Sequence, residues 1–121
     1  MAERLPIPID EFIESEWNEM EIYEITLDDK ARLLGNSRIS KKEYKIEKGK
    51  EFPLHQHDVP QLLLVEKGEL THYAEGREYA QYPNELLIVP ANLPRSALAG
   101  KLEELVVYVF KKNEKQNRGW R

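Results

Sequence analysis

The chain has 121 residues, of which 40% are hydrophobic and 33% are charged, and its formal net charge is -4 at pH 7. This length and balance suit one folded domain, and they exclude a disordered chain or two cores of ordinary size. The chain contains no cysteine, which excludes disulfides, thiolate zinc sites and cysteine nucleophiles, so a bound metal needs nitrogen and oxygen ligands.

Residues 1–20 are predicted to form a short helix or an irregular arm. Asp10 is a candidate helix cap, and Ile13 and Trp17 follow it at a helical spacing. The opening residues carry charge and proline where a signal peptide needs an apolar run, and no later segment approaches membrane-spanning length. We therefore expect a cytoplasmic protein that does not contact a membrane.

Short apolar or alternating runs separated by turn residues follow from residue 21, a pattern typical of an all-β sandwich or barrel. The runs span 21–27, 37–47, 61–66, 69–74, 86–90 and 102–110. The last run is apolar on both parities from Leu105 onward, so we expect both of its faces to be covered, as in a strand between two sheets. We assign residues 21–111 to one barrel.

The last residues, 112–121, are predicted to be a basic tail. The segment that begins at Lys111 has five cations and Trp120 against a single acid, Glu114; the cations are Lys111, Lys112, Lys115, Arg118 and Arg121. A weak polyanion contact and a solvated, frayed terminus both fit this composition, and we favour the frayed terminus. The overall negative charge gives no general reason to bind nucleic acid.

Two histidines provide the first candidate for chemistry. On a strand, the side chains of His55 and His57 leave the same face and can converge on one point. A turn is expected before Gln61, because Pro60 cannot donate a hydrogen bond to a strand ladder. The next strand begins at Gln61, which places this side chain beside the two histidines.

The spacing of these residues resembles the first motif of the cupin superfamily, Gly-x5-His-x-His-x3–4-Glu-x6-Gly. The matching positions are Gly49, His55, His57, Gln61 and Gly68, with Gln61 where glutamate is usual. The second motif, Gly-x5-Pro-x-Gly-x2-His-x3-Asn, matches in spacing but not in chemistry. Its positions hold Asn84, Pro90, Asn92, Arg95 and Ala99, so that Arg95 replaces the final histidine.

This resemblance, which covers roughly residues 40–110, implies an all-β cupin fold, the double-stranded β-helix or jelly-roll barrel, behind a short N-terminal helix or arm. Cupins commonly hold a divalent metal on two histidines, a glutamate and a last histidine. The resemblance therefore implies His55, His57 and Gln61 as ligands of Zn, Ni, Mn or Fe. Some cupins that isomerise sugars use glutamine in this way.

Arg95 opposes such a metal site. A guanidinium about 5 Å from a dication is repelled by roughly 6 to 7 kcal/mol at an effective dielectric constant of about 20. Either Arg95 turns to solvent, or an anionic ligand lies between the metal and the guanidinium. The second arrangement makes Arg95 a substrate-binding residue. We regard the two as equally good.

Three functions follow. The first is a cupin that binds a small acidic molecule with a divalent metal, as an isomerase or dioxygenase, and isomerisation of an acidic sugar is one form of it. The alternative is a non-catalytic ligand-binding or sensing cupin that lost its metal because of Arg95. The third is a structural dimerisation domain with a filled barrel. His72 and Tyr73 are further candidates for ligand binding, although ordinary packing explains both residue types.

Two expectations concern the whole protein. Small cupins commonly pair, and the apolar outer parity of residues 105–110 fits a homodimer. The charged residues are rich in glutamate and lysine, a bias associated with thermophilic proteins.

Overall fold

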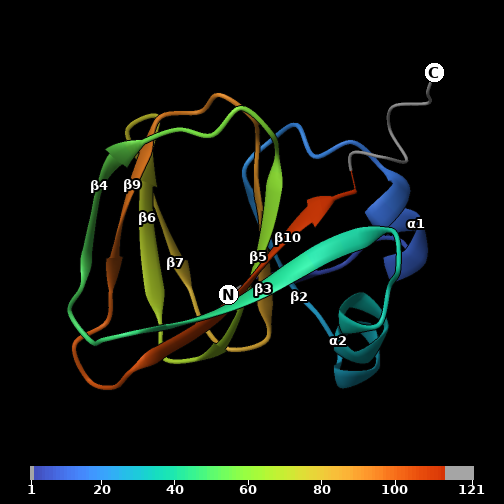
Figure 1. Cartoon of the computed structure of the whole chain (residues 1–121), viewed down its shortest axis with the longest axis horizontal. Coiled ribbons are helices and arrows are strands. Elements are labelled where there is room, and N and C mark those ends of the chain that lie inside the picture. The colour runs from blue at the N-terminus through green and yellow to red at the C-terminus, as the bar shows by residue number, and fades with distance from the viewer. Residues whose placement is uncertain (1, 114–121) are drawn as a thin grey trace.

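Residues 2–113 are described by the computed structural model, in which two β-sheets face each other and two short helices lie against one of them (Figure 1). The elements in chain order are β1 (Glu3–Arg4), α1 (Ile9–Glu14), β2 (Glu21–Glu24), α2 (Leu27–Leu34), β3 (Ile39–Ile46), β4 (Glu51–His55), β5 (Gln61–Lys67), β6 (Leu70–Ala74), β7 (Arg77–Gln81), β8 (Glu85–Val89), β9 (Arg95–Ala99) and β10 (Leu105–Lys112).

The larger sheet has six strands in the order β1-β2-β8-β5-β10-β3, and the smaller has four in the order β4-β9-β6-β7. All neighbouring strands are antiparallel except β1 and β2. This is the predicted all-β architecture. In the barrel, the consecutive strands β3 and β4 are edge strands of different sheets.

The strands β7 and β9 are absent from the predicted apolar runs. β9 has the sequence Arg-Ser-Ala-Leu-Ala and β7 the sequence Arg-Glu-Tyr-Ala-Gln, and neither is rich in β-branched residues. Both become strands through pairing with β6, which lies between them. The last predicted run, 102–110, is displaced toward the N-terminus, because β10 begins at Leu105 and continues to Lys112, and Leu102 is exposed.

The N-terminal arm contains the predicted helix, but its start differs from the expectation. Pro8 is the N-cap residue of α1, with no side-chain cap, and Asp10 lies inside the first turn. The fixed φ of proline suits the start of a helix, whereas the carboxylate of Asp10 interacts favourably with the helix dipole there.

The helix α2 was not predicted from the sequence. Thr26 and Asp29 form a capping box, in which Thr26 Oγ1 accepts from the backbone N–H of Asp29 and Asp29 Oδ2 accepts from that of Thr26. Leu33 is its only buried residue, so the helix lacks the apolar periodicity that reveals longer helices. The Thr-x-x-Asp capping pattern at residues 26–29 was the feature of the sequence that could have indicated this helix.

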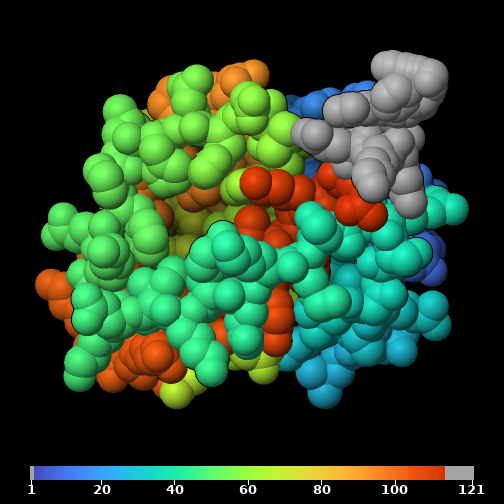
Figure 2. Space-filling view, in the orientation of Figure 1, coloured from blue at the N-terminus to red at the C-terminus, as the bar shows by residue number. Residues whose placement is uncertain are grey.

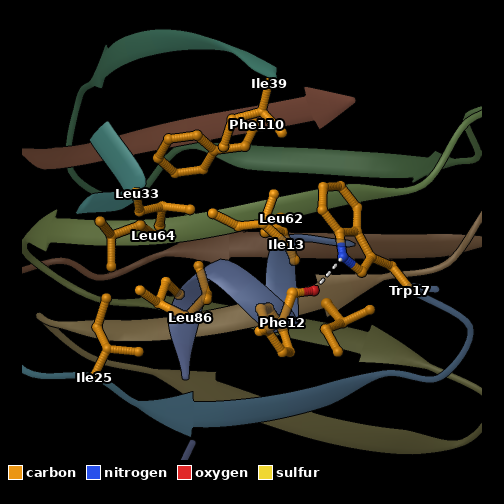
Figure 3. Close-up of a cluster of buried hydrophobic side chains, with 12 residues drawn as sticks. Phe12, Ile13, Trp17, Ile25, Leu33, Ile39, Leu62, Leu64, Leu86 and Phe110 are labelled. Atoms are coloured by element: carbon orange, nitrogen blue, oxygen red, sulfur yellow. Dashed lines mark hydrogen bonds between the residues drawn. The ribbon is translucent and has the colours of Figure 1, made fainter. Parts of the chain in front are cut away.

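Apolar side chains fill two layers, one on each face of the larger sheet. The outer layer lies between this sheet and the helical segment, where Trp17 Nε1 donates to the backbone carbonyl of Phe12 (Figure 3). The inner layer lies between the two sheets. On β5 the two layers alternate, with Leu62 and Leu64 in the outer layer and Leu63 in the inner one.

The outer face of β10 is covered by the chain itself. Phe110 is fully buried in the outer layer with the α1 residues Phe12 and Ile13, and Tyr108 packs against this cluster. The expectation that both faces of β10 are covered is therefore confirmed, but helices rather than a second sheet provide the outer cover. The apolar side chains on the outer face of β10 are buried by the same chain, so they no longer support a homodimer. The homodimer stays a prediction.

The predicted basic tail begins inside the fold. Lys112 is the last residue of β10, its Nζ donates to the carbonyl of Ser15, and this nitrogen lies 4.8 Å from the ring centroid of Trp17. The remaining basic residues, Lys115, Arg118 and Arg121, lie outside the described residues. Among residues 2–113, no helix has the length and apolar character needed to cross a membrane.

Candidate functional site

A cavity of about 250 Å³ lies between the two sheets. Its walls include the edge strands β3 and β4, and Figure 2 shows a hollow on this side of the molecule. The polar side chains that line it are Tyr44, His55, His57, Gln61, Arg95 and Lys111. The cavity thus brings together the four residues that the two sequence motifs singled out.

The two histidines reach the cavity from the end of β4. His55 is the last residue of this strand and lies opposite Arg95 in the pairing of β4 with β9, whereas His57 lies beyond the strand end. The expectation that both share one strand is therefore wrong. Their rings still meet edge to face, with centroids 5.2 Å apart, and the backbone N–H of Asn92 donates to the carbonyl of His57.

Hydrogen bonding defines the tautomer of His55. Its Nδ1 lies 2.7 Å from the carbonyl oxygen of Pro53, which can only accept, so Nδ1 carries the proton and donates. The lone pair of the neutral ring is then on Nε2. Burial, followed by the charge of Arg95, lowers the pKa of His57, which favours the neutral ring of that residue.

Arg95 is the most unusual group in the cavity. Its side chain is buried, with 6% exposure, and its Nη2 donates to Gln61 Oε1 over 3.4 Å. No carboxylate within residues 2–113 forms an ion pair with it, and its Nε has no hydrogen-bond partner among them. Burial lowers the pKa of Arg95, but arginine stays protonated in proteins. A positive charge is therefore held inside the barrel with no compensating carboxylate among the described residues.

The alternative left open by the sequence, in which Arg95 turns to solvent, is wrong. Its side chain faces the cavity because it opens β9 between β4 and β6, and the following Ala97 and Ala99 of the same parity are in the inner layer. Lys111 adds a second cation at the cavity wall, and no acidic side chain of the described chain lines the cavity.

The donor set fits a divalent metal poorly. The oxygen of Gln61 that would ligate the metal accepts instead from the guanidinium of Arg95, and neither histidine can supply a negative charge. Within residues 2–113 no group of three His, Cys, Asp or Glu side chains is arranged to hold a metal ion. A dication here would meet the charge of Arg95 with no anionic ligand from the described chain to offset it.

Of the other predicted ligand-binding residues, neither lines the cavity. Tyr73 lies on the opposite face of β6 and is 40% exposed. His72 is fully buried, with Nε2 3.0 Å from Gln81 Oε1. Burial lowers the pKa of His72 to about 4.

Gln81 was missed at the sequence level. It is fully buried, and its Nε2 donates to the backbone carbonyls of Leu63 and Glu85, so it connects β7 to β5 and β8. The one signal for it was the inward parity of residues 79 and 81, which becomes visible only when residues 77–81 are recognised as a strand.

Two sheets closed around a cavity that carries a His-x-His pair define a cupin barrel. The chain belongs to the family of the AraC-like ligand binding domain, whose model matches residues 43–111. It is a domain of a class that binds small molecules.

Solved structures share this fold at low sequence identity. A cupin-2 domain protein from Shewanella frigidimarina is 20% identical, with a TM-score of 0.54 over 74% of this chain and 94% of that one. A cupin superfamily protein from Desulfitobacterium hafniense is 18% identical, with a TM-score of 0.54 over 93% and 97%. An RmlC-like cupin with a double-stranded β-helix fold from Methanocaldococcus jannaschii is 20% identical, with a TM-score of 0.57 over 69% and 79%. No curated protein matches the chain.

Proposed function

We propose that this domain binds a small anion inside the barrel through Arg95, and that it acts as a ligand-binding module without a resident metal. The single observation that carries the proposal is the buried guanidinium of Arg95, which faces the cavity with no carboxylate partner among residues 2–113. Burial of an unpaired charge is unfavourable, and an anion that enters the cavity offsets this cost.

The chemistry of the surrounding side chains supports an oxyanion. A guanidinium can donate two parallel hydrogen bonds to a carboxylate or phosphate, and Arg95 Nε is free for one of them among the described residues. Gln61 Oε1 accepts from Nη2 of the same guanidinium. Burial and the charge of Arg95 lower the pKa of His57, so its ring provides a further polar contact without adding charge, and the ring of His55 lies against it.

Isothermal titration calorimetry with the sodium salts of acetate, benzoate, gluconate and phosphate tests this proposal. The Arg95→Gln variant removes the charge, and Arg77→Gln, an exposed arginine on β7, serves as a matched control. We expect at least one anion to bind the wild type and the control, and to lose affinity about tenfold or more in Arg95→Gln. Equal affinity in both variants, or no binding to the wild type, would overturn the proposal.

Metal content separates this function from the metal-dependent isomerase or dioxygenase. Protein purified without a nickel column is analysed by elemental mass spectrometry for Zn, Ni, Mn and Fe, beside the double variant His55→Ala/His57→Ala. We expect substoichiometric metal in both samples. Stoichiometric metal that disappears in the double variant would replace the metal-free module with a metal-dependent cupin in which Gln61 completes the ligand set.

A further inference from the structure

We infer that the anion is a monocarboxylate with a compact hydrocarbon body, rather than a sugar acid or an inorganic oxyanion. This inference rests on the proposed function and specifies the ligand of the same site. It is based on how polar and apolar residues divide the cavity wall.

Four of the six polar side chains that line the cavity cluster in one part of its wall, whereas the other two, Tyr44 and Lys111, are exposed. Arg95 donates to Gln61, lies opposite His55 in the strand pairing, and the ring of His55 contacts that of His57. These contacts link the four polar side chains directly to one another. A carboxylate bound to Arg95 therefore lies at the polar end of the wall, where the amide of Gln61 and a ring N–H of His57 are within the same group of side chains and can donate to it.

The wall becomes apolar two residues further along each strand. Leu63 follows Gln61 on the same face of β5, and Ala97 follows Arg95 on the same face of β9. Two residues along a strand correspond to about 6.6 Å, which is the length of a small organic body. The apolar part of the wall is completed by Ile46, Phe52, Leu70, Val107 and Val109.

This division discriminates between anions of equal charge. A hydrocarbon body placed against Leu63 and Val107 gains from burial of apolar surface. A polyhydroxylated body brings several hydroxyl groups against the same side chains, where most of them lose water without gaining a partner, since Tyr44 opposite Val107 offers a single phenol. Inorganic phosphate contacts only the polar end and leaves the apolar wall in contact with water.

Size and charge restrict the ligand further. A volume of about 250 Å³ corresponds to roughly eight water molecules at ~30 Å³ each, which accommodates an aromatic ring or a short branched chain with one carboxylate. Arg95 is the only buried cation that lines the cavity in the described chain, whereas Lys111 is exposed. One negative charge therefore matches the interior.

Calorimetry with matched probes tests the inference. Acetate, benzoate and gluconate carry the same single charge at pH 7 and differ in the attached body, and inorganic phosphate is the fourth probe. We expect benzoate to bind about tenfold or more tightly than acetate, because burial of a ring adds apolar contact area, and more tightly than gluconate and phosphate.

Two wall variants test where the body lies. Val107→Thr and Val109→Thr each introduce a hydroxyl at constant shape on the cavity side of β10, and Val106→Thr is the control on the opposite face of the same strand. We expect the cavity-side variants to weaken benzoate severalfold while acetate binding is unchanged, and the control to leave both unchanged. Thermal unfolding of each variant verifies folding, and the half-buried Val109 gives a milder substitution if Val107→Thr fails to fold.

The outcomes separate this inference from the proposed function. Arg95-dependent binding in which gluconate or phosphate equals or exceeds benzoate overturns the ligand class and leaves the anion site standing. Benzoate binding that is insensitive to both cavity-side variants also overturns the inference. If no probe binds in an Arg95-dependent manner, the proposed function and the ligand class fail together.

Discussion

The ring Nε2 of His72 lies 3.0 Å from Oε1 of Gln81, and the orientation of that amide is set by two backbone carbonyls that accept from its Nε2. Because the amide presents its oxygen to His72, the imidazole Nε2 carries the proton and donates. His72 Nδ1 then bears the lone pair, and it is buried with no hydrogen-bond partner among the described residues. A second proton would bind at this Nδ1, where none of the described residues accepts a hydrogen bond from it, so the charged ring would be buried without a partner.

Acid should therefore destabilise the protein through His72. Burial lowers the pKa of the folded state to about 4, against 6.5 when the ring is exposed, so the unfolded state binds the proton first as the pH falls. Stability is present in full above pH 6.5 and is lost between pH 6.5 and about 4, by roughly 3 kcal/mol. Urea denaturation across this window should show a weaker pH dependence for His72→Gln than for wild type. Identical slopes would contradict the assignment.

Replacement of Arg95 by methionine should stabilise the ligand-free protein while it abolishes anion binding. Methionine retains much of the side-chain volume and removes the buried charge, and substitutions of this kind for buried ions are often stabilising. We expect the free energy of unfolding to rise by about 1 to 2 kcal/mol, because loss of the hydrogen bond to Gln61 offsets part of the gain. Chemical denaturation without added anion measures it, and a clear loss of stability would show that Arg95 is compensated.

Gln81→Leu should destabilise the barrel without a change in the cavity lining. The substitution removes the donor to Leu63 and Glu85 and the acceptor for His72, and it leaves these buried groups unsatisfied. We expect a loss of about 2 to 4 kcal/mol in the free energy of unfolding. Gln56→Leu, at an exposed loop position, is the control and should change stability by less than about 0.5 kcal/mol. Similar losses in both variants would show that the contacts of Gln81 are not responsible.

The two glycines Gly68 and Gly76 should differ in their tolerance of alanine. Both have positive φ, +84° and +73°, so each substitution incurs backbone strain of about 1 kcal/mol. A Cβ at Gly68 would lie 2.8 Å from the backbone oxygen of Glu104, whereas a Cβ at Gly76 has no atom within 4 Å. Gly68→Ala should cost roughly 1 to 2 kcal/mol more than Gly76→Ala in urea denaturation. Equal losses in the free energy of unfolding would indicate that the backbone at Glu104 moves away from the added Cβ without loss of stability.

Much of the cavity was predictable because motif spacing carries geometric information. The intervals that place His55, His57 and Gln61 around a turn lead to a common cavity, even though His57 lies outside the strand. The direction of Arg95 was not predictable, since it depends on how β9 pairs with two strands distant in sequence. The pattern of residues within 95–99 does not specify which strands pair with β9.

The outer layer shows a different limit of the sequence. The apolar parity of β10 correctly indicated burial, but no local pattern shows whether a helix, a sheet or a second molecule provides the cover. The segment that provides it includes α2, whose short length and many charges concealed its helical state. Packing between segments far apart in the chain determines which segment covers β10, and a short window of sequence contains no record of that packing.

Successive side chains of β5 point alternately into the outer and the inner layer. The polar residues of the cavity therefore help to fix the register in which this strand pairs. In the present pairing, Gln61 faces Arg95 and Leu62 packs in the outer layer. A shift of one residue would turn Gln61 toward the aromatic side chains of the outer layer and present Leu62 to the guanidinium. Both exchanges are unfavourable, so the groups proposed to bind the ligand also select the correct pairing among alternatives that the apolar run 62–65 would otherwise allow.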